Sequence, residues 1–224
     1  MNAPPATIPV DVWSDIACPW CYIGKRNLET AIETFRERHP DEEVAVTYHS
    51  FELSPDTPVN FEGTEAEFLT ARMGLGREEV EAMHDRVTQI AAAAGLDYRF
   101  DDVRHTNTRK AHELLHHAAA AGRQAEAKER LMRAYFTEGR DLGREEVLAD
   151  VAAEAGIDRT GAVRALRSAE YAPAVEADVR LAHRFGIGGV PYFVLDRRFG
   201  VSGAQPPDVL AEALERALAA RAGD

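Results

Sequence analysis

The pattern of apolar and polar residues changes type along the chain. In residues 8–13, Ile and Val alternate with polar or proline positions, which predicts a short strand, and residues 44–48 (Val-Ala-Val-Thr-Tyr) predict a second one. Between them, an apolar stripe predicts a helix that ends near His39 and Pro40, because proline terminates a helix. The stripe consists of Tyr22, Leu28, Ile32 and Phe35.

From Glu65 to Phe185 the pattern is helical almost throughout, and glycines punctuate the segments. One expected helix stops at Gly95, where glycine favours the end of a helix. Its apolar face is expected to consist of Val80, Met83, Val87, Ile90, Ala91 and Ala94.

The C-terminal part returns to strands. Residues 192–195 and 199–202 predict a hairpin, and residues 206–221 predict a final helix. Strand, helix and strand, then a helical stretch, then a hairpin and a helix is the chain order of an α/β, thioredoxin-like fold with a large all-helical insertion. This order assigns residues 1–60 and 186–224 to a discontinuous thioredoxin-like domain and residues 61–185 to the helical insertion.

The charge of the chain argues against nucleic acids and membranes as partners. Its formal net charge is -12 with a pI near 5.2, and no run of Lys or Arg forms a patch for phosphates or anionic lipids. No apolar run approaches the length of a membrane-spanning helix. Residues 1–9 lack the basic start and the apolar stretch of a secretory signal, so we expect a cytoplasmic location.

The chain contains two cysteines, three positions apart in the motif Cys18-Pro19-Trp20-Cys21. In a reducing compartment such a pair is rarely a structural disulfide, because so short a loop gains little from closure. The spacing therefore favours redox chemistry or metal binding. The number of cysteines excludes a four-thiolate zinc site, and a mixed site needs two histidines in addition.

Redox chemistry requires that one thiol ionise, because only the thiolate attacks a disulfide. A helix N-terminus favours the anion at Cys18, and thiols in motifs of this type reach pKa values of roughly 3.5 to 7. Cys21 follows one helical turn later, within reach of a disulfide. We expect Cys18 to be exposed and Cys21 to be shielded, with Pro19 in the first helical turn and Trp20 offering an apolar face beside the sulfur.

A second motif, Gly188-Gly189-Val190-Pro191, precedes the strand expected at residues 192–195. A cis Val190–Pro191 bond leaves the Val190 backbone free to pair with an extended substrate beside Cys18. The alternative is an ordinary trans proline at the start of a strand, since only about 5% of bonds before proline are cis.

Residues 112–116 (His-Glu-Leu-Leu-His) match the zinc motif H-E-x-x-H. On a helix, His112 and His116 share one face and are able to bind zinc, with Glu113 as a general base. Thr106 or Asn107 is the expected cap of that helix, and the candidate third ligands are Glu126, Glu129 and Glu138. The alternative is a helix that exposes its polar residues beside an apolar face of Leu114 and Leu115, since the motif arises readily by chance.

Several segments spread over nearly the whole chain carry a resemblance to a known family. They are residues 13–24 with the cysteine motif, residues 51–55, Asn107-Thr108 with Ala111-His112, residues 134–136, and residues 189–193 with the later Val-Pro. Together they resemble the DsbA-type thioredoxin family, in particular its FrnE-like branch. The resemblance implies a DsbA-like fold with inserted helices, Cys18 and Cys21 as the redox pair, and Pro191 as the cis-proline facing them.

The chain departs from that family at one position. Thioredoxin-type proteins usually carry a buried acid six residues before the first cysteine, where it assists proton transfer to the resolving thiol, and this chain has Val12 there. Asp15, or else Asp11, is the candidate substitute. Related glutathione-using isomerases share the fold but as a rule keep a serine or a lone cysteine in place of the pair, so the two thiols argue for disulfide chemistry.

The sequence thus predicts a thiol-disulfide oxidoreductase in which Cys18 attacks and Cys21 resolves a mixed disulfide. The expected substrates are protein or small-molecule thiols and disulfides; no metal or organic cofactor is expected, and glutathione is a candidate co-substrate. Two alternatives are a glutathione-dependent isomerase or transferase of a small aromatic compound and a non-catalytic, chaperone-like binder. The direction of electron transfer and the oligomeric state stay open.

Overall fold

The computed structural model describes residues 7–59 and 61–222, so most of the N-terminal segment 1–9 lies outside the described residues. The strands and helices expected from the sequence pattern are present, and the final helix begins one residue later than expected. In chain order the elements are β1 (Ile8–Ser14), α1 (Pro19–Arg38), β2 (Val44–Ser50), α2 (Glu65–Met73), α3 (Arg77–Ala93), α4 (Arg109–Ala120), α5 (Gln124–Phe136), α6 (Glu145–Glu154), α7 (Arg159–Ser168), α8 (Ala172–Arg184), β3 (Tyr192–Leu195), β4 (Phe199–Ser202) and α9 (Pro207–Ala222).

The strands form one mixed sheet in the order β2-β1-β3-β4. β1 pairs with β2 in parallel, with Val10 opposite Val46, and with β3 antiparallel, with Val12 opposite Phe193. β3 and β4 form the expected hairpin. Because the N-terminal and C-terminal strands share this sheet, the loop after β1 comes to lie next to the loop before β3, although 150 residues and more separate them in the sequence.

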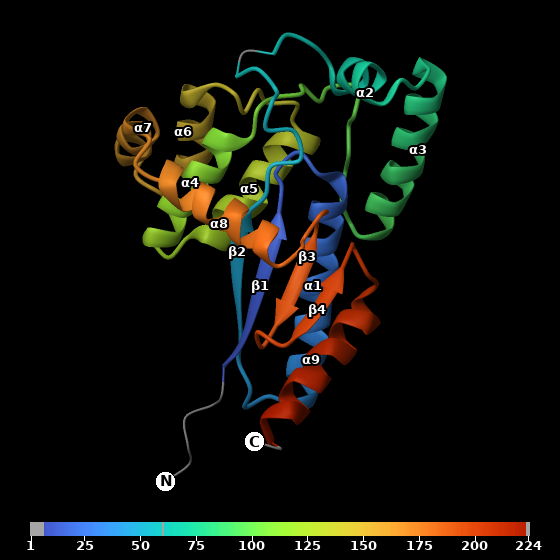
Figure 1. Cartoon of the computed structure of the whole chain (residues 1–224), viewed down its shortest axis with the longest axis vertical. Helices are drawn as coiled ribbons and strands as arrows, with labels where there is room; N and C mark the ends of the chain where they lie inside the picture. Colours follow the sequence, from blue (N-terminus) through green and yellow to red (C-terminus); the bar gives the residue numbers. More distant parts are fainter. Residues whose placement is uncertain (1–6, 60, 223–224) are drawn as a thin grey trace.

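Helices cover both faces of the sheet (Figure 1). α1 and α9 lie side by side along one face, and the apolar side chains between them and the sheet form one core cluster. Its largest contributors are Ile8, Val10, Leu28, Phe35, Phe193, Leu195, Leu210 and Leu214. α8 lies against the opposite face, where Trp13 packs with Ala182 and Ile187.

Helices α2 to α8 occupy the chain between β2 and β3, and α2 with α3 is set apart from α4 to α7 in Figure 1. The largest core cluster joins helices α3 to α7 to the loop after β1 and to the first turn of α1, through Ile16, Cys21 and Tyr22. This arrangement confirms the thioredoxin-like order with a helical insertion. The domain boundaries at residues 60/61 and 185/186 stay a prediction.

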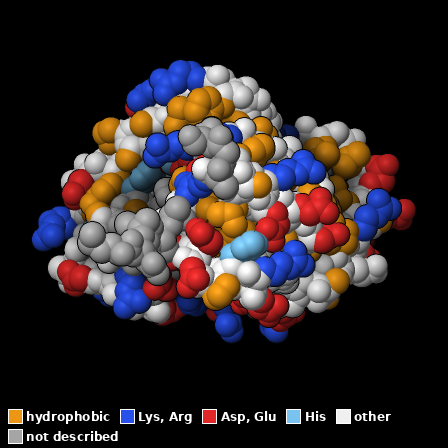
Figure 2. Space-filling view, turned by 90° about the horizontal axis from the view of Figure 1, so that it is seen from below, with side chains coloured by type: hydrophobic (Ala, Val, Ile, Leu, Met, Phe, Trp, Pro, Cys, Tyr) orange, Lys and Arg blue, Asp and Glu red, His pale blue; other side chains and the backbone are white. Residues whose placement is uncertain are grey.

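The surface carries charges of both signs. On the face shown in Figure 2, basic and acidic side chains are interspersed among the described residues, without a broad basic area. In the ranges 7–59 and 61–222, no helix combines the length and the apolar character needed to cross a bilayer.

Candidate active site

The cysteine pair lies at the N-terminus of α1, where the loop from β1 ends. Cys18 is the N-cap residue, with φ -93° and ψ 113°. Pro19 occupies the first helical position, where a backbone N–H would have no partner within the helix, so that the N–H missing from proline costs nothing there. The Cys21 N–H donates to the Cys18 carbonyl at 3.0 Å, so the two residues span one turn. Both cysteines are free thiols. The predicted strand-to-helix setting of the motif is confirmed.

The prediction that Cys18 is exposed is wrong. Its exposed fraction is 4%, close to the 2% of Cys21, whereas Trp20 is 40% exposed. The Cys18 thiol donates to the Val190 carbonyl at 3.7 Å, and the Tyr98 hydroxyl donates to the Pro19 carbonyl at 2.7 Å. Two segments distant in sequence therefore cover the first turn of α1, and the indole of Trp20 is the accessible part of the motif.

The electrostatics of the pair also differ from the expectation. The interaction with the neighbouring Cys21 thiol and burial raise the pKa of Cys18, and the N–H of Cys21 is the main influence that lowers it. A thiol beside Cys18 opposes a negative charge on its sulfur, and burial penalises that charge further. The lowering of the Cys18 pKa that was predicted from the helix N-terminus is therefore outweighed when both cysteines are free thiols.

The Val190–Pro191 peptide bond is cis, as the resemblance implies. Pro191 lies against α1 at Gly24, where an added Cβ would stand 2.8 Å from the proline Cγ. Only glycine at this position lets α1 and the Pro191 segment approach so closely. The structure thus brings together Cys18, Cys21 and Val190.

Asp15 is buried in the loop between β1 and α1. Its carboxylate interacts with His112 Nε2 at 3.2 Å and accepts the Leu53 N–H at 2.8 Å. Burial alone would raise the pKa of Asp15, but His112, the Leu53 N–H and Thr108 together lower it. Asp15 is therefore held as an anion near the cysteine pair, whereas Asp11 of β1 interacts with His49 of β2 at 2.9 Å. A proton-transfer role of Asp15 stays a prediction.

The H-E-x-x-H side chains do not converge on one point. His112 interacts with Asp15, whereas His116 lies 3.1 Å from Asp178. Within residues 7–59 and 61–222, no group of three or more His, Cys, Asp or Glu side chains is arranged to hold a metal ion. His112 and Glu113 are buried rather than exposed, so the alternative of a helix with an exposed polar face is wrong too.

The cap of α4 differs slightly from the expectation. Thr108 is the N-cap residue, but the Asn107 side chain accepts the Arg109 N–H at 3.0 Å and so supplies the capping bond. This contact fixes the start of the helix that presents His112 to Asp15.

One charged residue near the pair was not among the predicted site residues. Lys128 of α5 is fully buried, and its Nζ lies 5.7 Å from the centre of the Tyr48 ring. Its position was readable from the helical spacing, since Lys128 stands three and four residues before the buried Leu131 and Met132. A lysine on an apolar stripe was the signal that the sequence analysis missed.

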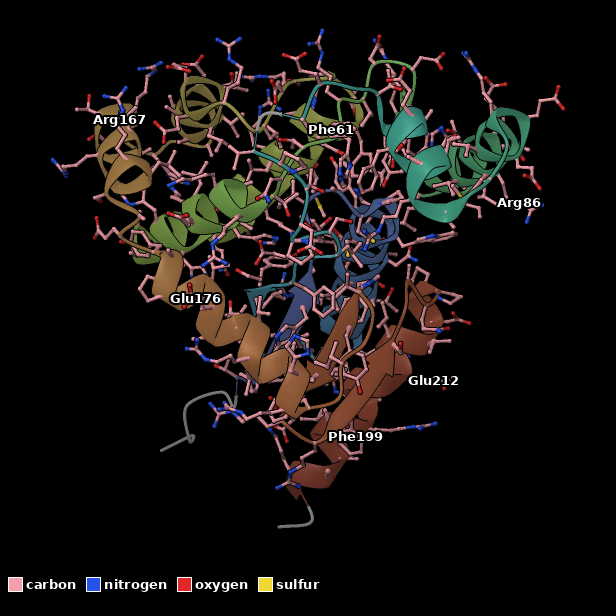
Figure 3. All side chains as sticks on the ribbon, turned by 45° about the horizontal axis from the view of Figure 1, so that its top comes forward. Phe61, Arg86, Arg167, Glu176, Phe199 and Glu212 are labelled. Carbon is pink, nitrogen blue, oxygen red and sulfur yellow. The ribbon has the colours of Figure 1, made fainter. Side chains whose placement is uncertain are left out.

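A cavity of about 620 Å³ opens next to the motif, between the first turn of α1, the Leu53 loop and helices α2 and α3. Its wall is mostly apolar and includes Pro19, Trp20, Leu53, Phe68, Leu69, Met73, Met83 and Val87. Asp15, Glu65, His84 and His105 are polar members. Phe61, labelled in Figure 3 on the segment between β2 and α2, packs edge-on against Phe68 and His105 behind this wall.

Comparison with known proteins supports the resemblance. The family described as DSBA-like thioredoxin domain matches residues 9–215. The crystal structure of a probable DsbA oxidoreductase from Streptomyces coelicolor, SCO1869, is 41% identical with a TM-score of 0.88, over 95% of this chain and 90% of that chain. The curated protein YwbO of Bacillus subtilis (strain 168) is 26% identical over 215 residues, which are 93% of this chain and 96% of YwbO.

A more distant structure shares the fold. The cytosolic disulfide reductase DsbM from Pseudomonas aeruginosa, solved with GSH, has a TM-score of 0.64 at 22% identity, over 94% of this chain and 98% of that chain. The DsbA-type resemblance and the DsbA-like fold with inserted helices are confirmed. The FrnE-like branch stays a prediction.

Proposed function

Because the chain belongs to the DSBA-like thioredoxin domain family, we propose that it exchanges thiols and disulfides through Cys18 as the attacking residue and Cys21 as the resolving residue. A thiol-disulfide oxidoreductase activity of the DsbA type follows from the family. The observation that carries the assignment of the two roles is the position of the pair. Cys18 caps α1 beside the Val190 carbonyl, and Cys21 lies one turn behind it in the core.

The reaction balances with sulfur chemistry alone. The Cys18 thiolate attacks one sulfur of a substrate disulfide, forms a mixed disulfide and releases the other substrate sulfur as a thiolate. The Cys21 thiolate then attacks the Cys18 sulfur, closes the intramolecular disulfide and releases the second substrate thiol. Two electrons reduce the substrate and the pair is oxidised, and the reverse sequence oxidises a dithiol. No metal or organic cofactor is required.

Substrate recognition is assigned to the residues around the sulfur. An extended substrate pairs with the Val190 backbone next to Pro191, beside Cys18. The exposed indole of Trp20, with Pro19, forms the rim where the apolar cavity opens. Protein or small-molecule disulfides fit such a site, and glutathione is a candidate co-substrate in a cytoplasmic setting, in line with the GSH in the structure of cytosolic DsbM.

Trapping of the mixed disulfide tests the roles of the two cysteines. Cys21→Ser and Cys18→Ser are incubated with oxidised glutathione and with a disulfide-bonded peptide, and adducts are measured by mass spectrometry without reductant. Cys21→Ser is expected to accumulate one adduct per chain that dithiothreitol removes, and Cys18→Ser none. Equal adducts in both variants, or adducts only in Cys18→Ser, contradict the assignment.

Further measurements on the purified protein distinguish this function from the two alternatives. Stoichiometric glutathione binding without adduct or redox turnover would favour an isomerase or transferase. Suppression of aggregation that survives loss of both cysteines, in a wild-type protein without redox turnover, would favour a chaperone-like binder. The reduction potential of the Cys18/Cys21 couple then gives the direction of transfer, since a strongly reducing value favours a reductase.

A further inference from the structure

Lys128 is a buried cation without local neutralisation. Its side chain is 0% exposed, and its Nζ has no hydrogen-bond partner among the residues that the structure describes. Burial of an unpaired ammonium group is costly, so such a group is rare without a functional reason. The contrast with Lys25 is informative, because that equally buried lysine interacts with Glu29 at 2.6 Å and with Glu129 at 2.5 Å. The structure therefore neutralises one buried lysine and leaves the other unpaired.

The surroundings of Lys128 contain the cysteine pair. The residues that flank it on α5, Ala127, Leu131 and Met132, belong to the same core cluster as Cys18 and Cys21. The titratable groups that act on it are Cys18 from the N-cap of α1, Cys21 and Lys25 from α1, and Asp15 from the preceding loop, while the ring of Tyr48 from β2 faces its Nζ. Burial lowers the pKa of Lys128 to about 8, and the charges of Cys21, Asp15 and Cys18 act in the opposite direction. The charge of Lys128 is thus tied to the ionisation of the thiols.

Asp15, a second buried charged group near the pair, is poorly suited to support a thiolate. Asp15 is an anion engaged by His112 and by the Leu53 N–H, and its charge opposes a second negative charge on Cys18. The position of the usual buried acid holds Val12, which has no proton to exchange. A cation is the group that favours an anionic sulfur in this environment.

We propose that Lys128 is a positioning residue for the redox reaction, whose buried ammonium group stabilises the thiolate form of the Cys18/Cys21 pair. The inference rests on the proposed function of the pair. When a thiol of the pair ionises, its proton passes to Lys128 or to solvent, and the ammonium offsets the new negative charge. When the pair closes to a disulfide, the negative charge disappears, the two electrons pass to the substrate disulfide, and Lys128 releases its proton more easily.

The variant Lys128→Met tests this role, because methionine keeps the length of the side chain and removes the charge. In the reduced variant, the pH midpoint of the thiolate absorbance is expected to rise by about one unit relative to wild type, a tenfold loss of thiolate below that midpoint. The reduction potential is expected to become more negative, since the thiolate state loses support. Resolution of a mixed disulfide with glutathione slows correspondingly at neutral pH.

Lys110→Met is the matched control, because Lys110 lies on α4 and contacts Glu113 and the Leu166 carbonyl rather than the two cysteines. It is expected to keep the thiolate midpoint and the potential of wild type. A merely structural role of Lys128 changes the unfolding free energy without moving either quantity. If Lys128→Met and wild type share one thiolate midpoint and one potential, the inference is overturned.

A measurement on wild type keeps the test independent of folding of the variant. The sequence contains three lysines, Lys25, Lys110 and Lys128, so the side-chain NMR signal of Lys128 has only two others to be distinguished from. The Lys128 signal is expected to titrate at a higher pH in the reduced protein than in the disulfide form. Equal midpoints in both forms overturn the inference. A wild-type pair that exchanges disulfides neither with glutathione nor with a disulfide-bonded peptide overturns the proposed function instead, which separates the two failures.

Discussion

The thiol of Cys18 lies 3.7 Å from the carbonyl oxygen of Val190, a residue 172 positions away in the sequence. The contact exists because β1 and β3 are neighbours in the sheet, so that the loops at their ends meet. It places the candidate nucleophile beside the Val190 backbone, which is the proposed pairing site for an extended substrate. It also explains why Cys18 is buried, since the Val190 segment covers the sulfur.

The approach of α1 to the Pro191 segment yields the first prediction. In Gly24→Ala, the new Cβ would stand 2.8 Å from Pro191 Cγ and 3.3 Å from Phe193 Cζ, so the segment must shift away from α1. We expect a loss of about 1–3 kcal/mol in unfolding free energy, measured by urea denaturation, together with slower disulfide exchange. The control Gly188→Ala has open space at its Cβ and is expected to stay near wild type. Wild-type stability of Gly24→Ala would show that the contact is not tight in solution.

The buried pair of Asp15 and His112 carries the second prediction. Asp15→Asn leaves the fully buried His112 without its acidic partner, and we expect a loss of about 3 kcal/mol in unfolding free energy. The folded-state pKa of Asp15 is lowered, so its contribution is present above the ordinary aspartate pKa and is lost as the pH falls through the folded value. The unfolding temperature of wild type is therefore expected to fall at acidic pH, and this fall is expected to be smaller in Asp15→Asn.

Asp97→Asn serves as the control for this pair, because the exposed Asp97–Arg99 ion pair contributes little to stability. The same Asp15 variant tests the proton-transfer role. If the pH dependence of disulfide exchange is the same in Asp15→Asn and wild type, Asp15 takes no part in that transfer.

Local sequence patterns were sufficient for the elements and for the position of the cysteine pair. A strand that runs into Cys18-Pro19 predicts a helix N-terminus there, and the structure has one. The burial of Cys18 was not predictable in this way, because it depends on Val190 and on Tyr98, which reach the site only through the tertiary fold. Likewise, residues 112–116 match a zinc motif, and only the tertiary fold shows that His112 interacts with Asp15 instead.

The apolar face of α3 shows the same limit. Val80, Val87 and Ala91 are buried as expected, but Ile90 is 38% exposed and Met83 lines the cavity. The spacing of these residues along the helix places all of them on one stripe, because spacing gives the direction of a side chain but not the elements that pack against it. The neighbours of a helix decide which edge of its stripe is covered.

A histidine held between two acids provides the third prediction. His49 Nδ1 lies 2.8 Å from Asp178 and Nε2 lies 2.9 Å from Asp11. Burial lowers the pKa of His49, but Asp178 and Asp11 together raise it above its ordinary value. The stabilisation is thus complete below the ordinary histidine pKa of about 6.5 and is lost as the pH rises through the folded value. In wild type the unfolding free energy is expected to fall as the pH rises over this range, and we expect His49→Gln to remove that fall.

Denaturant titrations at several pH values check this, with the exposed His183→Gln as the control. An unchanged alkaline limb in His49→Gln would contradict a charged His49 in the folded protein.

The cavity beside the motif leads to the last prediction. Met83 lines this cavity from α3, whereas Ile90 on the same helix is exposed and does not line it. In Met83→Trp, the larger side chain fills part of the space next to Pro19 and Trp20. If the cavity holds an apolar part of the substrate, KM for a disulfide-bonded peptide is expected to rise about tenfold, which corresponds to about 1.4 kcal/mol of binding free energy.

The reduction potential of the cysteine pair is expected to stay at the wild-type value in Met83→Trp, because no group near the sulfurs changes charge. Ile90→Trp adds the same ring outside the cavity and is expected to leave KM unchanged. Equal KM values for Met83→Trp, Ile90→Trp and wild type would mean that substrates approach Cys18 along the Val190 side alone.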